Sequence, residues 1–300
     1  MTLLATPAEK AELMQAATKG RSLWDDARAR LVRNKAAMAS LFILSFLVLV
    51  AIFGPLVWPH PYDKIFTEHA GDGPMLQGGH IFGFDVQGRD LVARTIYGLR
   101  ISLAVGVVAT LVSLIIGVAW GATAGYLGGR VDQVMMRIVD VLYALPFIFF
   151  VILMMVVFGR NIILIFVAIG AVEWLTMARI VRGQTISLRR KEFVEAAEAI
   201  GAPTARIVGR HIVPNVLGPV VVYVTLTIPA VILAESFLSF LGLGVQEPLT
   251  SLGNLIQNGA KEMEIMWWML VFPAVTMMVT LFCFNFIGDG LRDAIDPKDR

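Results

Sequence analysis

Three glutamates stand at every third position in a polar stretch that separates two long apolar runs: Glu192, Glu195 and Glu198. The stretch covers residues 179–214 and also holds seven Lys and Arg side chains. Residues three apart lie near one another on a helix, so these carboxylates would share one side. Isolated carboxylates of this kind offer ion pairing to a fixed partner. They do not form the pair of acids in a pocket that hydrolysis requires.

Other reactive patterns are missing from the sequence. No lysine directly follows a glycine, so the phosphate-binding pattern G-x-x-x-x-G-K-[ST] is not present. The sequence has no G-x-S-x-G and no H-E-x-x-H, and its four histidines lack the spacing of metal ligands. The single cysteine, Cys283, excludes an intrachain disulfide. We therefore expect no catalytic residue, no metal site and no cofactor, and any ATP would be hydrolysed by another subunit.

The elements that position these charges are two short helices. Residues from about 190 to 200 favour a helix, with the three glutamates on one side and Phe193, Ala197 and Ile200 on the other. Gly201 is expected to end it in a left-handed conformation. A second helix is expected from Pro203 to Ile212, with Pro214 at the entry to the next apolar run. On pattern alone, a solvated amphipathic loop is an equal alternative.

Composition places these elements in a membrane protein. The 300 residues are 57% hydrophobic and 16% charged, with a mean hydropathy of +0.74, whereas soluble domains carry about 25% charged residues. Six apolar stretches approach the roughly 20 residues that a span needs. They are residues 36–58, 101–122, 136–158, 162–178, 215–234 and 265–288. The predicted fold class is an all-α membrane protein with six transmembrane helices.

Orientation follows from the basic residues. If the N-terminus is cytoplasmic, nineteen Lys and Arg residues fall on the inner side and six on the outer side. The stretch 179–214 and both termini would then face the cytoplasm. The first apolar run begins too late for a cleaved signal, so residues 1–35 are predicted to be a retained tail with a short surface helix.

The outer segments are expected to be residues 59–100 and 242–264. The first is too long for a simple turn, and it either contacts an external binding protein or caps the helix bundle. Trp267 and Trp268 stand where an outer aromatic belt is expected.

Ionisable residues inside the spans are functional hypotheses by default. Asp140 follows Arg137 by three residues, which favours a local ion pair. Glu235 falls near the outer end of the fifth span, within reach of water or a partner subunit. Glu173 lies near the middle of the fourth span, where it either faces the translocation path or pairs with a neighbouring helix. Glu173 and Glu235 are the two candidate path-lining residues.

The stretch 179–214 resembles the EAA loop of permease subunits in type I ABC importers, in the form of the peptide branch. The resemblance rests on Glu195-Ala196-Ala197, on Gly201 and on His211-Ile212-Val213-Pro214. Residues 20–24, 177–185, 210–218 and 284–297 are similar to the C-type permease of the oligopeptide branch. Trp120 and Glu173 depart from that pattern.

The resemblance implies a fold, partners and site residues. The fold would be a MetI-like bundle in the bacterial inner membrane, paired with a homologous B-type permease subunit. Further partners would be two cytoplasmic ATPase subunits, a periplasmic peptide-binding protein, the peptide and membrane lipid, with no nucleic acid. The residues implied in ATPase coupling are Phe193, Glu195, Ala196, Ala197, Gly201, His211 and Pro214.

The expected domain organisation has five parts. They are a tail (1–35), a first transmembrane helix (36–58), a periplasmic loop (59–100), a transmembrane domain (101–290) with the EAA loop at 189–214, and a second tail (291–300). The expected function is that of a permease subunit in an ATP-driven oligopeptide importer. Dipeptide, nickel and glutathione importers share these motifs, and a secondary transporter or a membrane-embedded scaffold or receptor subunit is the alternative from another class.

Overall fold

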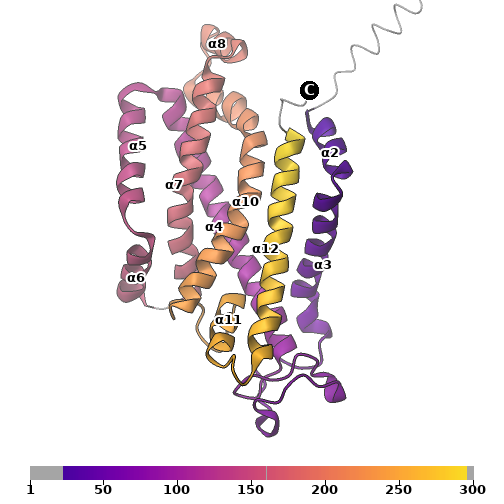
Figure 1. Ribbon diagram of the computed structural model, residues 1–300. Helices are drawn as coiled ribbons and strands as arrows, with labels where there is room; N and C mark the ends of the chain where they lie inside the picture. The colour runs from indigo at the N-terminus through magenta and orange to yellow at the C-terminus, as the bar shows by residue number, and fades with distance from the viewer. Residues whose placement is uncertain (1–22, 160, 296–300) are drawn as a thin grey trace, which may run out of the picture.

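The computed structural model describes residues 23–159 and 161–295, and within these ranges the chain is helical, with two isolated β-bridges. Long helices run side by side along the bundle (Figure 1). The elements are α2 (Leu23–Arg33), α3 (Lys35–Val57), η1 (Thr67–His69), η2 (Gln77–Gly79), α4 (Leu91–Leu127), α5 (Gly129–Ala144), α6 (Phe147–Phe158), α7 (Ile162–Arg189), α8 (Glu192–Ala199), α9 (Thr204–Ile207), η3 (Val208–Ile212), α10 (Val213–Phe240), α11 (Leu252–Lys261) and α12 (Trp267–Ile295).

The all-α class with six expected spans is confirmed, with a difference at the third span. Within the described ranges, five helices are long and apolar enough to cross a membrane. The third expected span, 136–158, is instead divided between α5 and α6, which are bent by 85°. The pair counts as a sixth span if both halves are taken together. Pro146 precedes α6 and has no amide hydrogen to continue the helix from α5, which explains the break.

Several helices extend beyond the apolar stretches that indicated them. α4 begins at Leu91, ten residues before the expected start at 101, because Asp90 caps it: its carboxylate accepts a hydrogen bond from the Ala93 amide at 2.7 Å. α7 continues to Arg189, and α12 continues to Ile295, into the expected tail. Helices can leave the hydrocarbon region without ending, so hydropathy locates a span but not the ends of its helix.

A helix is present where the surface helix was expected, as α2, and Leu31 of α2 lies near Gly290 of α12. Its position on the membrane surface stays a prediction. The expectation for residues 1–22 lies outside the described residues.

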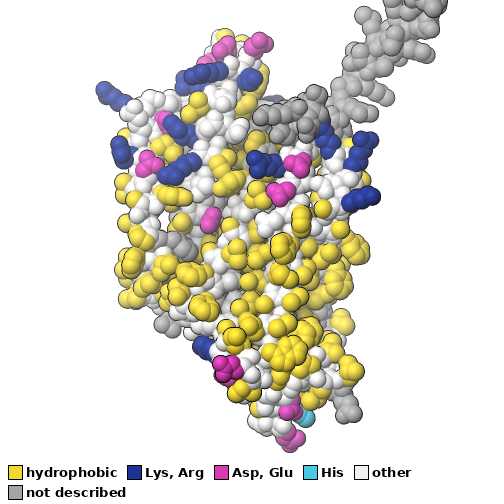
Figure 2. Space-filling view, viewed as in Figure 1, with side chains coloured by type: hydrophobic (Ala, Val, Ile, Leu, Met, Phe, Trp, Pro, Cys, Tyr) yellow, Lys and Arg dark blue, Asp and Glu magenta, His cyan; other side chains and the backbone are white. Residues whose placement is uncertain are grey.

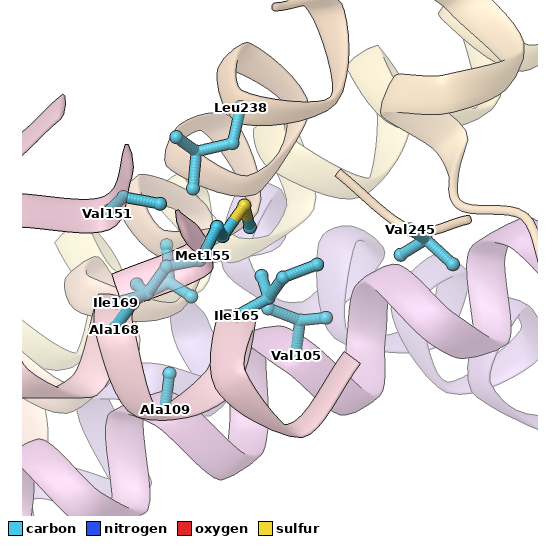
Figure 3. Packing of buried hydrophobic residues seen from close by; sticks show 10 residues of the cluster. Val105, Ala109, Val151, Met155, Ile165, Ala168, Ile169, Leu238 and Val245 are labelled. Carbon is cyan, nitrogen blue, oxygen red and sulfur yellow. The ribbon is translucent and has the colours of Figure 1, made fainter. Parts of the chain in front are cut away.

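The core is formed mainly by α4, α7 and α10. One buried cluster joins Val105 and Ala109 of α4, Val151 and Met155 of α6, Ile165, Ala168 and Ile169 of α7, and Val231 and Leu238 of α10, with Val245 beyond α10 (Figure 3). Three glycines at four-residue spacing let α4 approach α7 closely. A Cβ at Gly117 would lie 2.5 Å from Met177 Cβ, and one at Gly125 would lie 2.8 Å from the Arg182 carbonyl oxygen. This backbone contact fixes α4 and α7 as one unit.

Charge is distributed unevenly along the bundle. Lys and Arg side chains gather at the end that carries α8 and α2, and hydrophobic side chains cover the middle (Figure 2). The opposite end holds the loop between α3 and α4, and acidic side chains are visible there (Figure 2). An apolar middle between two polar ends is the surface expected of a chain that crosses a bilayer.

Candidate functional site

The short helix α8 lies at the basic end of the bundle, beyond the end of α7 (Figure 1). Lys191, which precedes it, has an extended backbone conformation, and this interrupts the helical path from α7. The other end of α8 is closed by Gly201, whose φ of 76° is left-handed. The Gly201 amide donates to the Glu198 carbonyl at 2.9 Å, and the Ala202 amide donates to the Ala197 carbonyl at 3.1 Å. This is the glycine closure that the sequence predicts.

Two residues of α8 pack against the bundle. Val194 is 0% exposed and Ala197 is 5% exposed, and both pack in a cluster with Tyr126, Val181 and Ile207. Phe193 and Ile200, by contrast, are 41% and 84% exposed. Phe193, Ala197 and Ile200 are three or four residues apart and so lie on one side of the helix, as expected. Burial against the bundle, however, involves Val194 and Ala197, and it leaves Phe193 and Ile200 exposed.

The three glutamates of α8 are all exposed. Glu198 differs in that its carboxylate accepts a hydrogen bond from the Tyr126 hydroxyl at 2.9 Å. Tyr126 lies in the last turn of α4, and the Arg189 guanidinium lies over its ring at 5.6 Å. The expected grouping of the three carboxylates on one side is consistent with their exposure, and the contact of Glu198 with Tyr126 is an addition that the sequence did not indicate. The exposed residues of α8 are Glu192, Phe193, Glu195, Ala196, Glu198 and Ala199, and Ile200 directly after it is also exposed.

The second helix of the loop is not a separate element. α9 passes into a π-helical turn, η3, and then directly into α10. Pro214 lies in the first turn of α10, exposed, and it cannot donate a hydrogen bond to the carbonyl four residues earlier; a π-turn is one adjustment to such a loss. His211 is half-buried, and its backbone carbonyl accepts from the Asn215 side chain at 2.7 Å. Movement of the 204–212 segment is thus linked to α10 through continuous helix.

A charged groove lies beside this end of the bundle, between α5 and α7. Its volume is about 860 Å³, and two ion pairs line it. Arg182 binds Asp132 through two nitrogens, at 2.5 and 2.6 Å. Arg179 binds Asp140 at 2.8 Å and lies over the Tyr143 ring at 4.3 Å.

The predicted pairing of Asp140 with Arg137 is wrong, because the partner of Asp140 comes from a different helix. The spacing of charged residues in a sequence can indicate ion pairs within one helix, but not pairs between two helices.

The candidate path-lining residues lie in different surroundings. Glu235 of α10 is 0% exposed, so water does not reach it in this conformation, contrary to the expectation. Its carboxyl group accepts hydrogen bonds from Ser239 at 2.7 Å and from Ser102 of α4 at 3.4 Å. Glu173 of α7 is half-buried, and within residues 23–159 and 161–295 it has neither a hydrogen-bond nor an ion-pair partner. The neighbouring-helix pair weighed for Glu173 is therefore not formed within the described part of this chain.

A polar network at the opposite end was missed by the sequence analysis. Arg94 is 1% exposed and lies 3.4 Å from the Asp85 carboxylate, and Arg89 binds both Asp85 at 2.7 Å and Glu247 at 3.0 Å. This network joins the two segments that were expected to be outer loops. In the part of the chain that the structure describes, no group of three or more His, Cys, Asp or Glu side chains is arranged to hold a metal ion.

Comparison with known proteins assigns the family. Residues 117–300 match the model of the binding-protein-dependent transport system inner membrane component. The chain belongs to this family. It is therefore a multi-pass, non-catalytic permease subunit of the inner membrane. Residues 22–77 match a second model, the N-terminal transmembrane domain of oligopeptide transport permease C.

Relatives match over nearly the whole chain. The oligopeptide transport system permease protein OppC of Haemophilus influenzae is 54% identical, over 98% of this chain and 94% of the relative. OppC of Escherichia coli strain K12 is 58% identical, over 94% of this chain and 93% of the relative. The dipeptide transport system permease protein DppC of Bacillus subtilis strain 168 is 48% identical, over 93% of this chain and 87% of the relative. The resemblance to ABC importer permeases is confirmed.

A solved structure confirms the fold. A chain of the MetNI methionine ABC transporter, in inward-facing conformations, superposes with a TM-score of 0.56 and 19% identity. The match covers 69% of this chain and 96% of that chain. The expected MetI-like bundle is therefore correct.

Proposed function

We propose that this chain is the C-type permease subunit of an ATP-driven oligopeptide importer. Together with a homologous B-type permease subunit it would form the translocation path across the inner membrane. Two cytoplasmic ATPase subunits would drive the complex, and a periplasmic binding protein would deliver the peptide. The identity of 54–58% to OppC proteins over nearly the full chain is the observation that supports oligopeptides as the solute.

We propose that α8 is the contact with an ATPase subunit. Its outward side offers a charge at Glu195, an aromatic ring at Phe193, and the small residue Ala196 that permits close backbone approach. Ile200, which was not among the residues implied in ATPase coupling, adds an exposed apolar side chain next to Gly201. Ala197 supports this surface from inside, since it packs against the bundle. His211 and Pro214 would transmit movement of the loop to α10.

The orientation required by this proposal places α8 and both termini in the cytoplasm. The distribution of Lys and Arg supports it, because these residues gather at the α8 end (Figure 2). The loop between α3 and α4 would then face the periplasm. ATP-driven closure of the ATPase subunits would move the α8 region and switch the bundle between inward-open and outward-open states.

A role in the translocation path is proposed for Glu173 only. Its half-buried carboxyl group has no partner among residues 23–159 and 161–295, so a group outside this chain would satisfy it. The B-type permease or the passing peptide would supply that group. Glu235 is enclosed by serine side chains, which supports a structural role instead.

Growth of an amino-acid auxotroph tests the solute. Deletion of this gene is expected to abolish growth on tripeptides to pentapeptides that supply the required amino acid, while growth on dipeptides continues. A plasmid copy of the gene should restore growth. Loss of growth on dipeptides alone would instead assign the chain to a dipeptide importer, which the 48% identity to DppC makes the second candidate. Unchanged growth on every peptide would contradict the proposal and favour a nickel or glutathione importer.

A further inference from the structure

One polar contact joins α8 to a distant part of the chain. The Tyr126 hydroxyl donates a hydrogen bond to the Glu198 carboxylate across a separation of 72 residues in sequence, at 2.9 Å. Because the acceptor carries a charge, this bond is of the stronger kind. The guanidinium of Arg189, the last residue of α7, lies over the same ring, 5.6 Å from its centroid. Three helices therefore meet at one tyrosine.

The ring of Tyr126 is held in place by apolar packing. It is 7% exposed and belongs to the same buried cluster as Val194 and Ala197, the two buried residues of α8. The Tyr126 hydroxyl is the polar group next to this apolar cluster, and Glu198 is the residue of α8 that accepts its hydrogen bond. A fixed ring leaves the hydrogen bond little freedom of direction, so the bond sets where the last turn of α8 lies.

No continuous helix connects α8 with the elements before and after it. Lys191 before the helix is extended, and Gly201 after it is left-handed, so helical continuity is interrupted on both sides. Side-chain contacts therefore contribute to holding α8 at its angle to the bundle. The contact with Tyr126 is the polar one, and it connects α8 with α4, which runs from Leu91 to Leu127 through the length of the bundle (Figure 1).

We propose that Tyr126 and Glu198 are positioning residues that make α8 and α4 move together. In this inference, which rests on the coupling role proposed for α8, Glu198 acts on the bundle and does not contact the ATPase. Movement imposed on α8 would pass through Tyr126 into α4, and from α4 into α7 through the glycine contacts at Gly117 and Gly125. Docking of the ATPase would not need this bond, because the exposed Phe193 and Ile200 take no part in it.

The test uses the complete transporter reconstituted in proteoliposomes with its binding protein and a radiolabelled oligopeptide. Tyr126→Phe removes only the hydroxyl. Copurification of the ATPase subunits should be unchanged, whereas peptide imported per ATP hydrolysed should fall about tenfold, the size expected for loss of a hydrogen bond to a charged group. Asp293→Asn, a change at an exposed carboxylate of α12 outside the α8 surface, is the matched control and should leave this ratio unchanged.

A double-mutant cycle separates positioning from general damage. Glu198→Ala should lower the ratio as much as Tyr126→Phe does, and the double variant should be no worse than either single one. Glu198→Gln keeps an oxygen that accepts the tyrosine hydrogen and should restore the ratio to within about twofold of the wild type.

Three results would overturn the inference. They are a normal ratio in Tyr126→Phe, additive effects in the double variant, and loss of ATPase subunits from the Tyr126→Phe complex, which would assign the pair to docking. These results can be distinguished from failure of the proposed function, because in that case the wild-type complex itself would import no oligopeptide.

Discussion

Gly201 illustrates how a single residue controls the α8 region. Its φ is 76°, and an added Cβ would meet no atom within 4 Å, so the demand for glycine comes from backbone conformation alone. The role of Gly201 could be predicted from the sequence, because a glycine directly after a helix-forming run commonly ends the helix. The position of Glu198 was not predictable, since its partner, Tyr126, comes from a helix 72 residues earlier.

Replacement of Gly201 tests its conformation. Gly201→Val should abolish peptide uptake although the chain still inserts into the membrane, because a β-branched residue in the left-handed region costs about 1–3 kcal/mol and shifts the end of α8. Uptake and membrane content are measured in the same cells. Gly183→Val is the control: an added Cβ there also meets no atom within 4 Å, and Gly183 lies inside the regular helix α7. Normal uptake by a well-expressed Gly201→Val variant would refute the role of this residue.

At the scale of elements, the groove between α5 and α7 is lined by ion pairs that only the structure revealed. Hydropathy located the apolar helices, but it merged α5 and α6 into one straight span and gave no indication of an 85° bend. It also could not assign Asp132 and Asp140 to their arginines on α7. The early start of α4 could have been predicted from Asp90, because aspartate is a common N-cap residue and Asp90 caps this helix.

Exchange of charges tests the contact between α5 and α7. Arg182→Asp would oppose Asp132 with a like charge and should destabilise the purified chain in detergent by about 1 kcal/mol. This corresponds to a loss of roughly 2–4 °C in the melting temperature. Adding Asp132→Arg should restore most of it. Arg137→Asp, on the same groove but with no ion pair within the described ranges, is the control. If the double exchange is no more stable than Arg182→Asp alone, the pair does not hold the two helices together.

At the scale of the whole molecule, the distribution of apolar and basic residues defined the fold class. Alternating spans and polar segments predicted a helical membrane bundle, and the clustering of Lys and Arg at one end indicated its orientation (Figure 2). The packing of α4 against α7 and the network of Asp85, Arg89 and Glu247 at the opposite end depend on three-dimensional contacts, so the sequence alone did not reveal them. Function required comparison with relatives, because no residue of the chain carries out a reaction.

The central claim is that α8 faces the cytoplasm and meets an ATPase subunit there. It is tested most directly with a single cysteine at position 200 (Ile200→Cys) in a Cys283→Ser background, treated with a thiol reagent that does not cross membranes. The reagent should label inside-out vesicles and spare right-side-out ones, and bound ATPase subunits should slow the labelling. Glu264→Cys, an exposed position just before α12, should give the opposite sidedness. Labelling of position 200 from the outside, or labelling that the ATPase subunits do not affect, would contradict the account.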